Sequence, residues 1–268
     1  MELFDSHAHY FDRRFFSDEN PKGVEALLLD DVFGEGIEGV INVGTNNDNN
    51  VICIEQAAQF DKMYAAVGIH PEDVGYARHS ISEEINILAD MLDTKEKRSA
   101  SKIVALGEIG FDYHYEGFDK ELQKRYFDAQ MALACELDIP VIIHDRDAHG
   151  DCFETVLRYP KVRGVFHSYS GSAEMAKELV KRGWYISFSG VLTFKNARKT
   201  VEVAETVPSE RLLIETDAPY LAPHPFRGRL NHSGFVRYTA ERLAEIKGVG
   251  VEEIAHITRK NVENLFGV

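Results

Sequence analysis

The sequence lacks an excess of positive charge. Its 268 residues include 30 lysines and arginines against 44 aspartates and glutamates, a formal net charge of -14. Broad electrostatic capture of duplex nucleic acid needs many basic side chains to neutralise phosphates, so this composition argues against it. Any contact with nucleic acid must be local. Bound cations can supply positive charge for such a contact, because a metal ion reverses the field around it.

Long apolar runs and paired cysteines are also missing. No stretch approaches the roughly 18 residues that a membrane-spanning helix needs, and residues 1–7 show neither the basic nor the apolar region of a signal peptide. The three cysteines, Cys53, Cys135 and Cys152, have no Cys-x-x-Cys spacing, which is typical of reduced thiols. We expect a cytoplasmic protein that does not partner a membrane.

Linker-like composition is absent as well. No stretch is rich in proline, serine and glycine, and no internal repeat is evident. With 44% hydrophobic residues, a chain of this length can bury one large core. We therefore predict a single domain over residues 1–268.

Short runs rich in valine, isoleucine, phenylalanine and tyrosine predict eight strands. These are residues 3–9, 39–45, 64–70, 103–110, 140–146, 164–170, 185–190 and 212–217. Apolar residues three and four apart predict helices between them, such as 51–60, 81–92, 121–137, 173–182 and 196–207. Apolar strands that alternate with helices favour an α/β fold, a closed (β/α)₈ TIM barrel, with an open doubly wound sheet as the alternative. Residues 235–266 read as C-terminal helices that stop at Gly248 and restart near Val251.

Nearly every predicted strand ends in a residue that can bind a metal or a phosphate, and barrel strand ends converge on the face where active sites form. His7 and His9 lie two residues apart, so both imidazoles can point into one site. Glu108 follows the apolar run 103–106, and a lone buried carboxylate is costly unless it is paired, protonated or bound to metal. The other strand endings are His144, His167 and Asp217.

Six candidate ligands are more than the three protein groups of an ordinary catalytic zinc site. We therefore predict two divalent ions, bridged by the two carboxylate oxygens of Glu108. Ion pairs of this kind stabilise both attacking and leaving oxygens in phosphatases, nucleases and aminopeptidases. The expected ligands are His7, His9 and Asp217 for one ion, and His144 and His167 for the other.

Seven short motifs occur in order along the chain. They are DSHAH at 5–9, GIHP at 68–71, GEIGFDY at 107–113, PVIIHDRDA at 140–148, HSYSG at 167–171, ISFSG at 186–190 and ETDAPYLAP at 215–223. Together they resemble the TatD family of metal-dependent deoxyribonucleases, within the amidohydrolase superfamily. The resemblance implies a distorted TIM barrel, divalent metals and 3′-to-5′ exonuclease activity on DNA, with RNA as a further substrate.

The family's metal-site positions match the same six side chains. Glu108 stands where some superfamily members carry a carboxylated lysine, which favours the nuclease branch. The loop after the last predicted strand departs from the family, because His232 and Ser233 stand where many relatives have glutamate and proline. This departure leaves the substrate detail open. Imidazole ligands favour zinc, manganese, cobalt or nickel, whereas the family nucleases are described with magnesium. We expect zinc, manganese or magnesium, and the sequence does not fix which ion is bound.

Hydrolysis requires a nucleophilic water molecule and a base that reaches it. We expect Asp217 to orient the water and accept its proton, and His70 to donate to a substrate phosphate or leaving oxygen. An acidic surface with a focused cationic site favours single-stranded DNA or a 3′ end. Candidate phosphate-binding side chains are Arg146, Lys195 and Arg227.

Two alternatives remain at this point. The same ligands activate water for other electrophiles, so a hydrolase of a small ester, amide or phosphoester is the first. A metal-stabilised scaffold without turnover is the second. The sequence indicates no protein partner.

Overall fold

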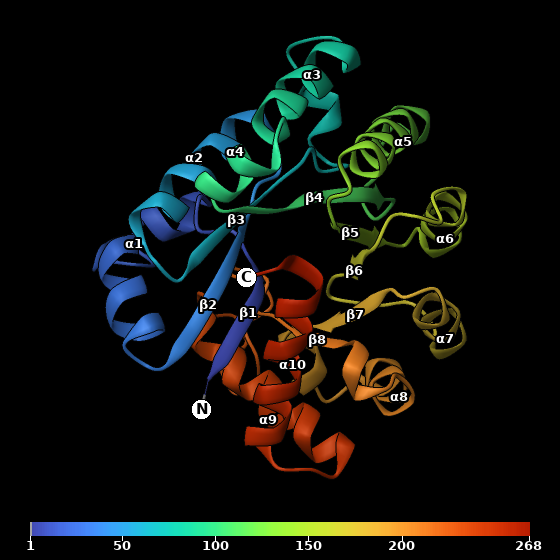
Figure 1. The fold of residues 1–268 in the computed structure, drawn as a ribbon. Coiled ribbons are helices and arrows are strands. Elements are labelled where there is room, and N and C mark those ends of the chain that lie inside the picture. Colours follow the sequence, from blue (N-terminus) through green and yellow to red (C-terminus); the bar gives the residue numbers. More distant parts are fainter. Residues whose placement is uncertain (1) are drawn as a thin grey trace. The chain divides into compact units, whose positions relative to one another are not determined.

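The computed structural model describes residues 2–268 and contains eight parallel strands in the order β1 to β8, each followed by helical segments (Figure 1). This order confirms the predicted (β/α)₈ class. The strands are β1 (Leu3–Ala8), β2 (Ile37–Val43), β3 (Met63–Val67), β4 (Ile103–Asp112), β5 (Val141–Arg146), β6 (Gly164–Phe166), β7 (Tyr185–Phe188) and β8 (Leu212–Ile214). The prediction of a single domain over residues 1–268 stays a prediction.

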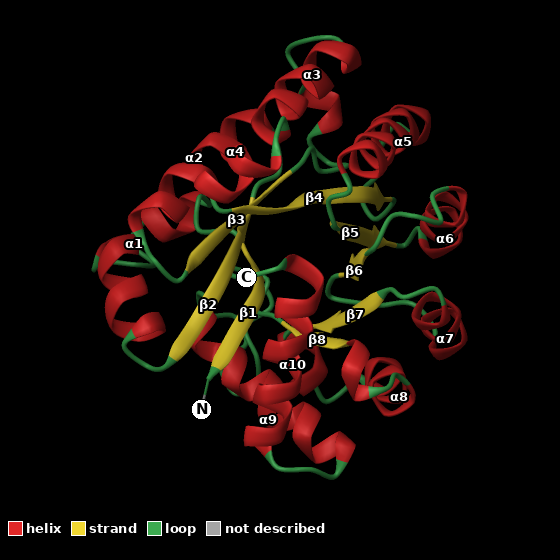
Figure 2. Cartoon of the chain, in the orientation of Figure 1, coloured by secondary structure: helices red, strands yellow, loops and turns green. Residues whose placement is uncertain are grey.

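Helices follow the strands throughout the described residues, in red in Figure 2. They are α1 (Gly23–Ala26), which a π-helical turn (Leu27–Phe33) continues, α2 (Asn47–Gln59), α3 (Ile81–Leu92), α4 (Lys95–Ala100), α5 (Lys120–Leu137), α6 (His149–Arg158), α7 (Ala173–Lys181), α8 (Arg198–Thr206), α9 (Val236–Lys247) and α10 (Val251–Phe266). Among the described residues, no helix is both long enough and apolar enough to cross a membrane.

Polar side chains fix where several helices begin and end. Asn46 accepts a hydrogen bond from the N–H of Asn49 at the start of α2, and Ser80 and Glu83 form a reciprocal capping box at the start of α3. The predicted stop at Gly248 is confirmed, because this glycine ends α9 in the left-handed region with φ of 68°. α10 then begins at Val251, as expected.

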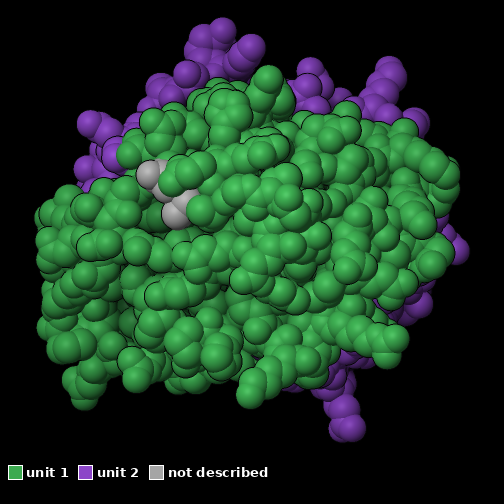
Figure 3. All heavy atoms as spheres, turned by 90° about the horizontal axis from the view of Figure 1, so that it is seen from below, with its two compact units in different colours: residues 1–42, 167–268 green, residues 43–166 purple. Residues whose placement is uncertain are grey.

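The described chain divides into two compact units, coloured separately in Figure 3. Unit 1 comprises residues 2–42 and 167–268, and unit 2 comprises residues 43–166. We describe each unit separately.

In unit 1, β1 pairs in parallel with β2, and β7 pairs with β8. The segment after β8 lies beside β1, because Ala8 and Ala218 form a bridge and the N–H of His9 donates to the carbonyl of Ala218 at 2.7 Å. The first strand and the end of the last strand are therefore neighbours, which brings their polar residues together.

In unit 2, β3, β4, β5 and β6 pair in parallel in that order. Gly110 lies opposite His144 in the pairing of β4 with β5. Its φ is 150°, and a Cβ there would lie 1.9 Å from the carbonyl oxygen of His144. Only glycine fits this close approach between the two strands.

Most predicted strand ends differ from those in the structure, and three predicted strands extend three or more residues too far. β3, β6 and β8 stop at Val67, Phe166 and Ile214, so the candidate residues beyond them lie in loops. Near two of these ends the backbone turns into the left-handed region, with φ of 37° at Ser168 and 58° at Asp217. Extended geometry cannot continue through such residues. The affected candidates are His70, His167 and Asp217, and His9 lies one residue beyond β1.

Candidate metal centre

In unit 1, two imidazoles and a carboxylate converge. The Nε2 atoms of His7 and His9 are 3.1 Å apart, and they lie 3.8 and 3.3 Å from Oδ1 of Asp217. Both rings are buried. Buried nitrogen and carboxylate oxygen atoms facing one another suit a divalent ion of the zinc or manganese type. The structure thus brings together three of the predicted ligands.

The backbone of Asp217 aims its carboxylate at these rings. Its left-handed conformation is held by a hydrogen bond from its N–H to the carbonyl of His7 at 2.9 Å. Burial raises the pKa of this carboxyl, but the hydrogen bond with His9 and the nearby His167 and His7 outweigh burial and lower it. Asp217 is therefore ionised near neutral pH and can act as a ligand or a proton acceptor.

His167 belongs to the same unit and stacks on His7, with ring centroids 4.1 Å apart. Its Nδ1 lies 3.1 Å from Oε1 of Glu215, which also accepts the N–H of Ser168 at 2.8 Å. A carboxylate at Nδ1 fixes the proton there and leaves Nε2 as the ligand atom. Candidate donor atoms of His7, His167 and Glu215 lie within 4.8 Å of one another.

The sequence reasoning missed Glu215 as a functional residue. Glu215 is 1% exposed. It sits two positions before Asp217 in the ETD motif. Two acidic residues at this spacing after an apolar run were the available signal.

Asp5 ties the two polar segments of unit 1 together. Its carboxylate accepts hydrogen bonds from the N–H groups of His7 and Thr216, at 3.2 and 2.9 Å, and from the hydroxyl of Thr216 at 2.5 Å. Burial raises the pKa of Asp5 to about 7, and these hydrogen bonds oppose that rise. Asp5 therefore fixes the backbone from which the two candidate ligands project.

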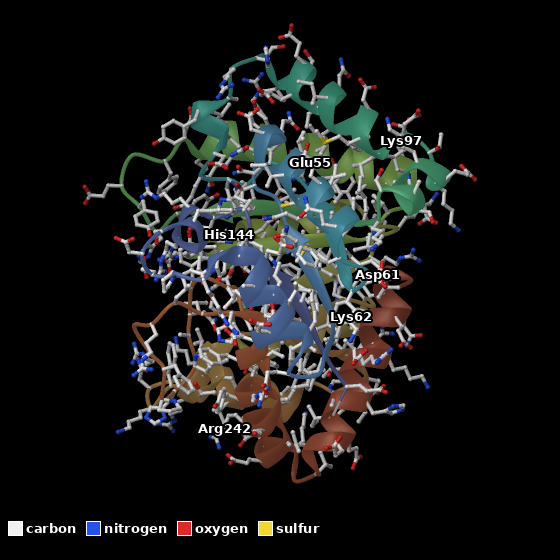
Figure 4. The ribbon with its side chains drawn as sticks, turned by 90° about the vertical axis from the view of Figure 1, so that its left-hand side faces the viewer. Glu55, Asp61, Lys62, Lys97, His144 and Arg242 are labelled. Carbon is white, nitrogen blue, oxygen red and sulfur yellow. The ribbon has the colours of Figure 1, made fainter. Side chains whose placement is uncertain are left out.

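In unit 2, Glu108 and His144 form the second group. Oε1 of Glu108 lies 2.5 Å from Nδ1 of His144, and Glu108 is 2% exposed. Candidate donor atoms of His70, Glu108 and His144 lie within 4.8 Å of one another. In Figure 4 His144 lies on the strands, whereas the labelled Glu55 and Lys97 belong to helices.

Asp112 holds the other nitrogen of His144. Its Oδ2 lies 2.9 Å from Nε2 of His144, and its Oδ1 accepts the N–H of His114 at 2.9 Å. Burial raises the pKa of Asp112, but the hydrogen bonds with His144 and with the N–H of His114, together with the nearby charges of His144 and Arg146, outweigh burial and lower it. An ionised carboxylate at Nε2 leaves Nδ1 to face Glu108 and an ion. The sequence reasoning gave Asp112 no such role, although residues 108 and 112 share a strand face.

The hydrogen bonds of His70 favour a donor role over metal ligation. Its Nδ1 accepts the N–H of Glu72 at 3.1 Å, so in the neutral ring the proton is on Nε2. Nε2 lies 3.5 Å from Oε1 of Glu108. An Nε2–H group can donate to an oxygen but has no lone pair for a metal. This agrees with the predicted role of His70 and leaves it a prediction.

The three candidate phosphate-binding side chains divide between the units. Arg146 ends β5 in unit 2, and its guanidinium lies 5.0 Å from the ring centroid of Tyr115. Arg227 and Lys195 are exposed in unit 1, and the guanidinium of Arg227 lies 4.1 Å from the ring centroid of Phe194. Their substrate contacts stay predictions.

Comparison with known proteins identifies the family. Residues 4–267 match the family model described as TatD related DNase. The chain is 40% identical to the uncharacterized metal-dependent hydrolase YabD of Bacillus subtilis, over 99% of both chains. It is 35% identical to YcfH of Escherichia coli K12, also an uncharacterized metal-dependent hydrolase, over 100% of this chain and 97% of that one. The solved structure of YJJV, a TatD homologue from E. coli K12, superposes with a TM-score of 0.87 at 29% identity, over 99% and 98% of the chains.

Proposed function

Since the chain belongs to the TatD-related DNase family and is a metal-dependent hydrolase, we propose that it cleaves phosphodiester bonds at the 3′ ends of single-stranded DNA. One observation carries the proposal. Each unit combines a buried group of candidate metal ligands with a side chain that can transfer a proton, an acceptor in unit 1 and a donor in unit 2. The acceptor is the ionised Asp217 and the donor is Nε2–H of His70.

The proposed cofactors are two divalent ions of zinc, manganese or magnesium, held by the six predicted side chains. The ions supply Lewis acidity, which makes water more acidic and offsets charge on phosphoryl oxygens. The donor sets suit such ions, because imidazole nitrogens and carboxylate oxygens converge in each unit. Those side chains are His7, His9, Glu108, His144, His167 and Asp217.

The protein's own groups would perform the proton transfers. Asp217 orients the attacking water and accepts its proton, since its carboxylate is ionised near neutral pH. His70 donates from Nε2 to a phosphate or leaving oxygen. Glu215 and Asp112 hold the rings of His167 and His144 in the orientation that ligation needs.

A chain end is the favoured substrate because the formal charge of -14 opposes tracking along duplex DNA. RNA is a further proposed substrate. We propose the cytoplasm as the location, since Cys53, Cys135 and Cys152 are all free, as expected in a reducing compartment.

The test is a metal titration of chelator-treated protein on 3′-labelled single-stranded DNA, duplex DNA and RNA, beside a panel of small esters, amides and phosphoesters. We expect stepwise shortening of the single-stranded 3′ end when an ion is restored. Turnover confined to the small-molecule panel would overturn the nuclease assignment. Nicking of closed circular DNA at the rate of 3′ shortening would overturn the preference for chain ends.

A further inference from the structure

We propose that Tyr115 and Arg146 form a stacking platform for a nucleobase, beside the phosphate that the ligand group of unit 2 would hold. The inference rests on the proposed function and extends it to a second part of the substrate. The platform lies on the loop between β4 and α5 and on the last residue of β5. It would bind a base in single-stranded nucleic acid by its face.

The loop presents aromatic rings to solvent. Tyr115 is 55% exposed and Phe118 is 41% exposed. Phe118 stacks on Tyr113, with centroids 4.7 Å apart and planes 13° apart. The rings of His114 and Tyr115 are nearly perpendicular, with centroids 5.0 Å apart. Folding alone would favour covering such rings, so a run of them in one exposed loop suggests a flat, apolar ligand. Figure 4 shows the loop, in green, standing out from the body of its unit.

Arg146 gives the platform its positive charge. Its guanidinium lies 5.0 Å from the centroid of the Tyr115 ring, and Nη1 is 3.5 Å from the Tyr115 hydroxyl. Nη1 also lies 3.9 Å from Oδ2 of Asp112. The side chain of Arg146 is 42% exposed. A guanidinium plane over an aromatic ring is a surface on which a base can stack while a neighbouring phosphate pairs with the charge.

The position of Arg146 connects the platform with the ligand group. It lies two residues after His144 on β5, so the two side chains emerge on the same face of the strand, about 6.6 Å apart along it. Asp112 contacts both residues, at 2.9 Å from Nε2 of His144 and 3.9 Å from Nη1 of Arg146. A nucleotide whose phosphate approaches His144 would therefore have its base or its next phosphate at the platform.

Stacking also fits the charge of the protein. Base stacking on aromatic side chains adds to binding without further basic residues, and it tolerates any base because every base has a π-face. A protein with a formal charge of -14 can therefore hold a single strand without a basic groove. We therefore expect the platform to bind the four bases with little preference among them.

The experiment measures binding and turnover separately in the metal-loaded protein. Fluorescence anisotropy follows a labelled single-stranded oligonucleotide whose 3′-terminal linkage is a hydrolysis-resistant phosphorothioate, and steady-state kinetics follow the natural oligonucleotide. Tyr115→Ala should weaken binding roughly 5- to 150-fold and raise KM with little change in kcat. Tyr115→Trp should retain binding. Tyr76→Ala is the matched control, because Tyr76 is 84% exposed in the same unit, and it should bind as the wild type does.

An oligonucleotide with abasic sites at its 3′ end separates stacking from other causes. The wild type and Tyr115→Ala should bind it equally, because no base remains to stack. Equal binding of the normal oligonucleotide by both proteins, or an equal loss on the abasic one, would overturn the platform. If the wild type binds through Tyr115 but does not hydrolyse DNA, the proposed function fails and the platform stands.

Discussion

At the scale of single residues, the protonation states of the histidines follow from their hydrogen-bonding partners. Glu215 lies at Nδ1 of His167, which prepares Nε2 of that ring for a metal. His144 has Asp112 at Nε2 and Glu108 at Nδ1, so its Nδ1 faces the carboxylate with which it would share an ion. His70 instead accepts a backbone N–H at Nδ1 and becomes a donor. One residue type thus serves two chemical roles, set by its neighbours.

Glu108→Ala should abolish hydrolysis of single-stranded DNA while the protein stays folded, because it removes the carboxylate that faces both His144 and His70. The measurement is turnover at saturating metal, with circular dichroism to check folding. Glu55→Ala, an exposed change on α2 in the same unit, is the control and should leave turnover unchanged. Undiminished turnover in Glu108→Ala would remove the predicted bridging role.

Asp112→Asn should lower metal affinity or activity by roughly 10- to 100-fold, because the neutral amide no longer orients His144 as an ionised acceptor. Calorimetric titration of the chelator-treated protein with manganese or zinc measures the affinity directly. Asp112→Glu should restore part of it. Asp147→Asn, which alters an exposed carboxylate beside His114, should bind metal as the wild type does. An unchanged metal affinity in Asp112→Asn would show that Asp112 does not position His144.

At the scale of elements, close packing of strands places the candidate ligands. Gly110 lets β4 approach β5 so that Glu108, Asp112 and His144 meet. In unit 1, the bridge between Ala8 and Ala218 brings the end of the first strand beside the segment that follows the last strand. At the contact of β4 with β5, the absence of a side chain at Gly110 is therefore a condition for the candidate ligands to meet.

Gly110→Ala should destabilise the protein by at least about 3 kcal/mol, because the new Cβ meets the carbonyl of His144 and the φ of 150° strains any side chain. Urea unfolding measures the loss. Gly75→Ala is the control, since a Cβ there has no heavy atom within 4 Å, and it should change stability little. A Gly110→Ala protein as stable as the control would contradict this account of the β4–β5 contact.

At the scale of the whole molecule, we expect a histidine outside the candidate site to limit stability in acid. His232 is half-buried, and burial lowers its pKa from 6.5 to about 4, against an opposing effect of the Asp31 carboxylate. Between pH 6.5 and 4 the unfolded chain therefore binds a proton at His232 that the folded protein does not bind. The part of the free energy of unfolding that depends on His232 is fully present above pH 6.5 and is lost as the pH falls toward 4.

His232→Gln should remove the fall in the free energy of unfolding between pH 6.5 and pH 4. We expect this fall to be roughly 3 kcal/mol in the wild type. The measurement is the free energy of urea unfolding against pH for the wild type and the variant. His256→Gln is the control, because His256 is exposed. Parallel curves for wild type and His232→Gln would show that the buried ring does not cause the acid sensitivity.

The sequence alone determined the alternation of strands and helices, the family resemblance and the six candidate ligands. Apolar periodicity and motif order are properties of the sequence itself, so they can be recognised without the tertiary structure. Predicted helix 81–92 agrees with α3 residue for residue, and the break at Gly248 follows from local glycine geometry. The strand ends failed because left-handed turns such as those at Ser168 and Asp217 leave no periodic signal.

Only the tertiary structure decided which polar groups hold the candidate ligands. Glu215 contacts His167 across 48 residues of sequence, and Asp112 contacts His144 across 32. Asp5 reaches Thr216 across 211. Hydrogen bonds of this separation depend on how strands pair and where loops turn, so no local pattern contains them. The sequence therefore named the candidate ligands, and folding determined which side chains contact and orient them.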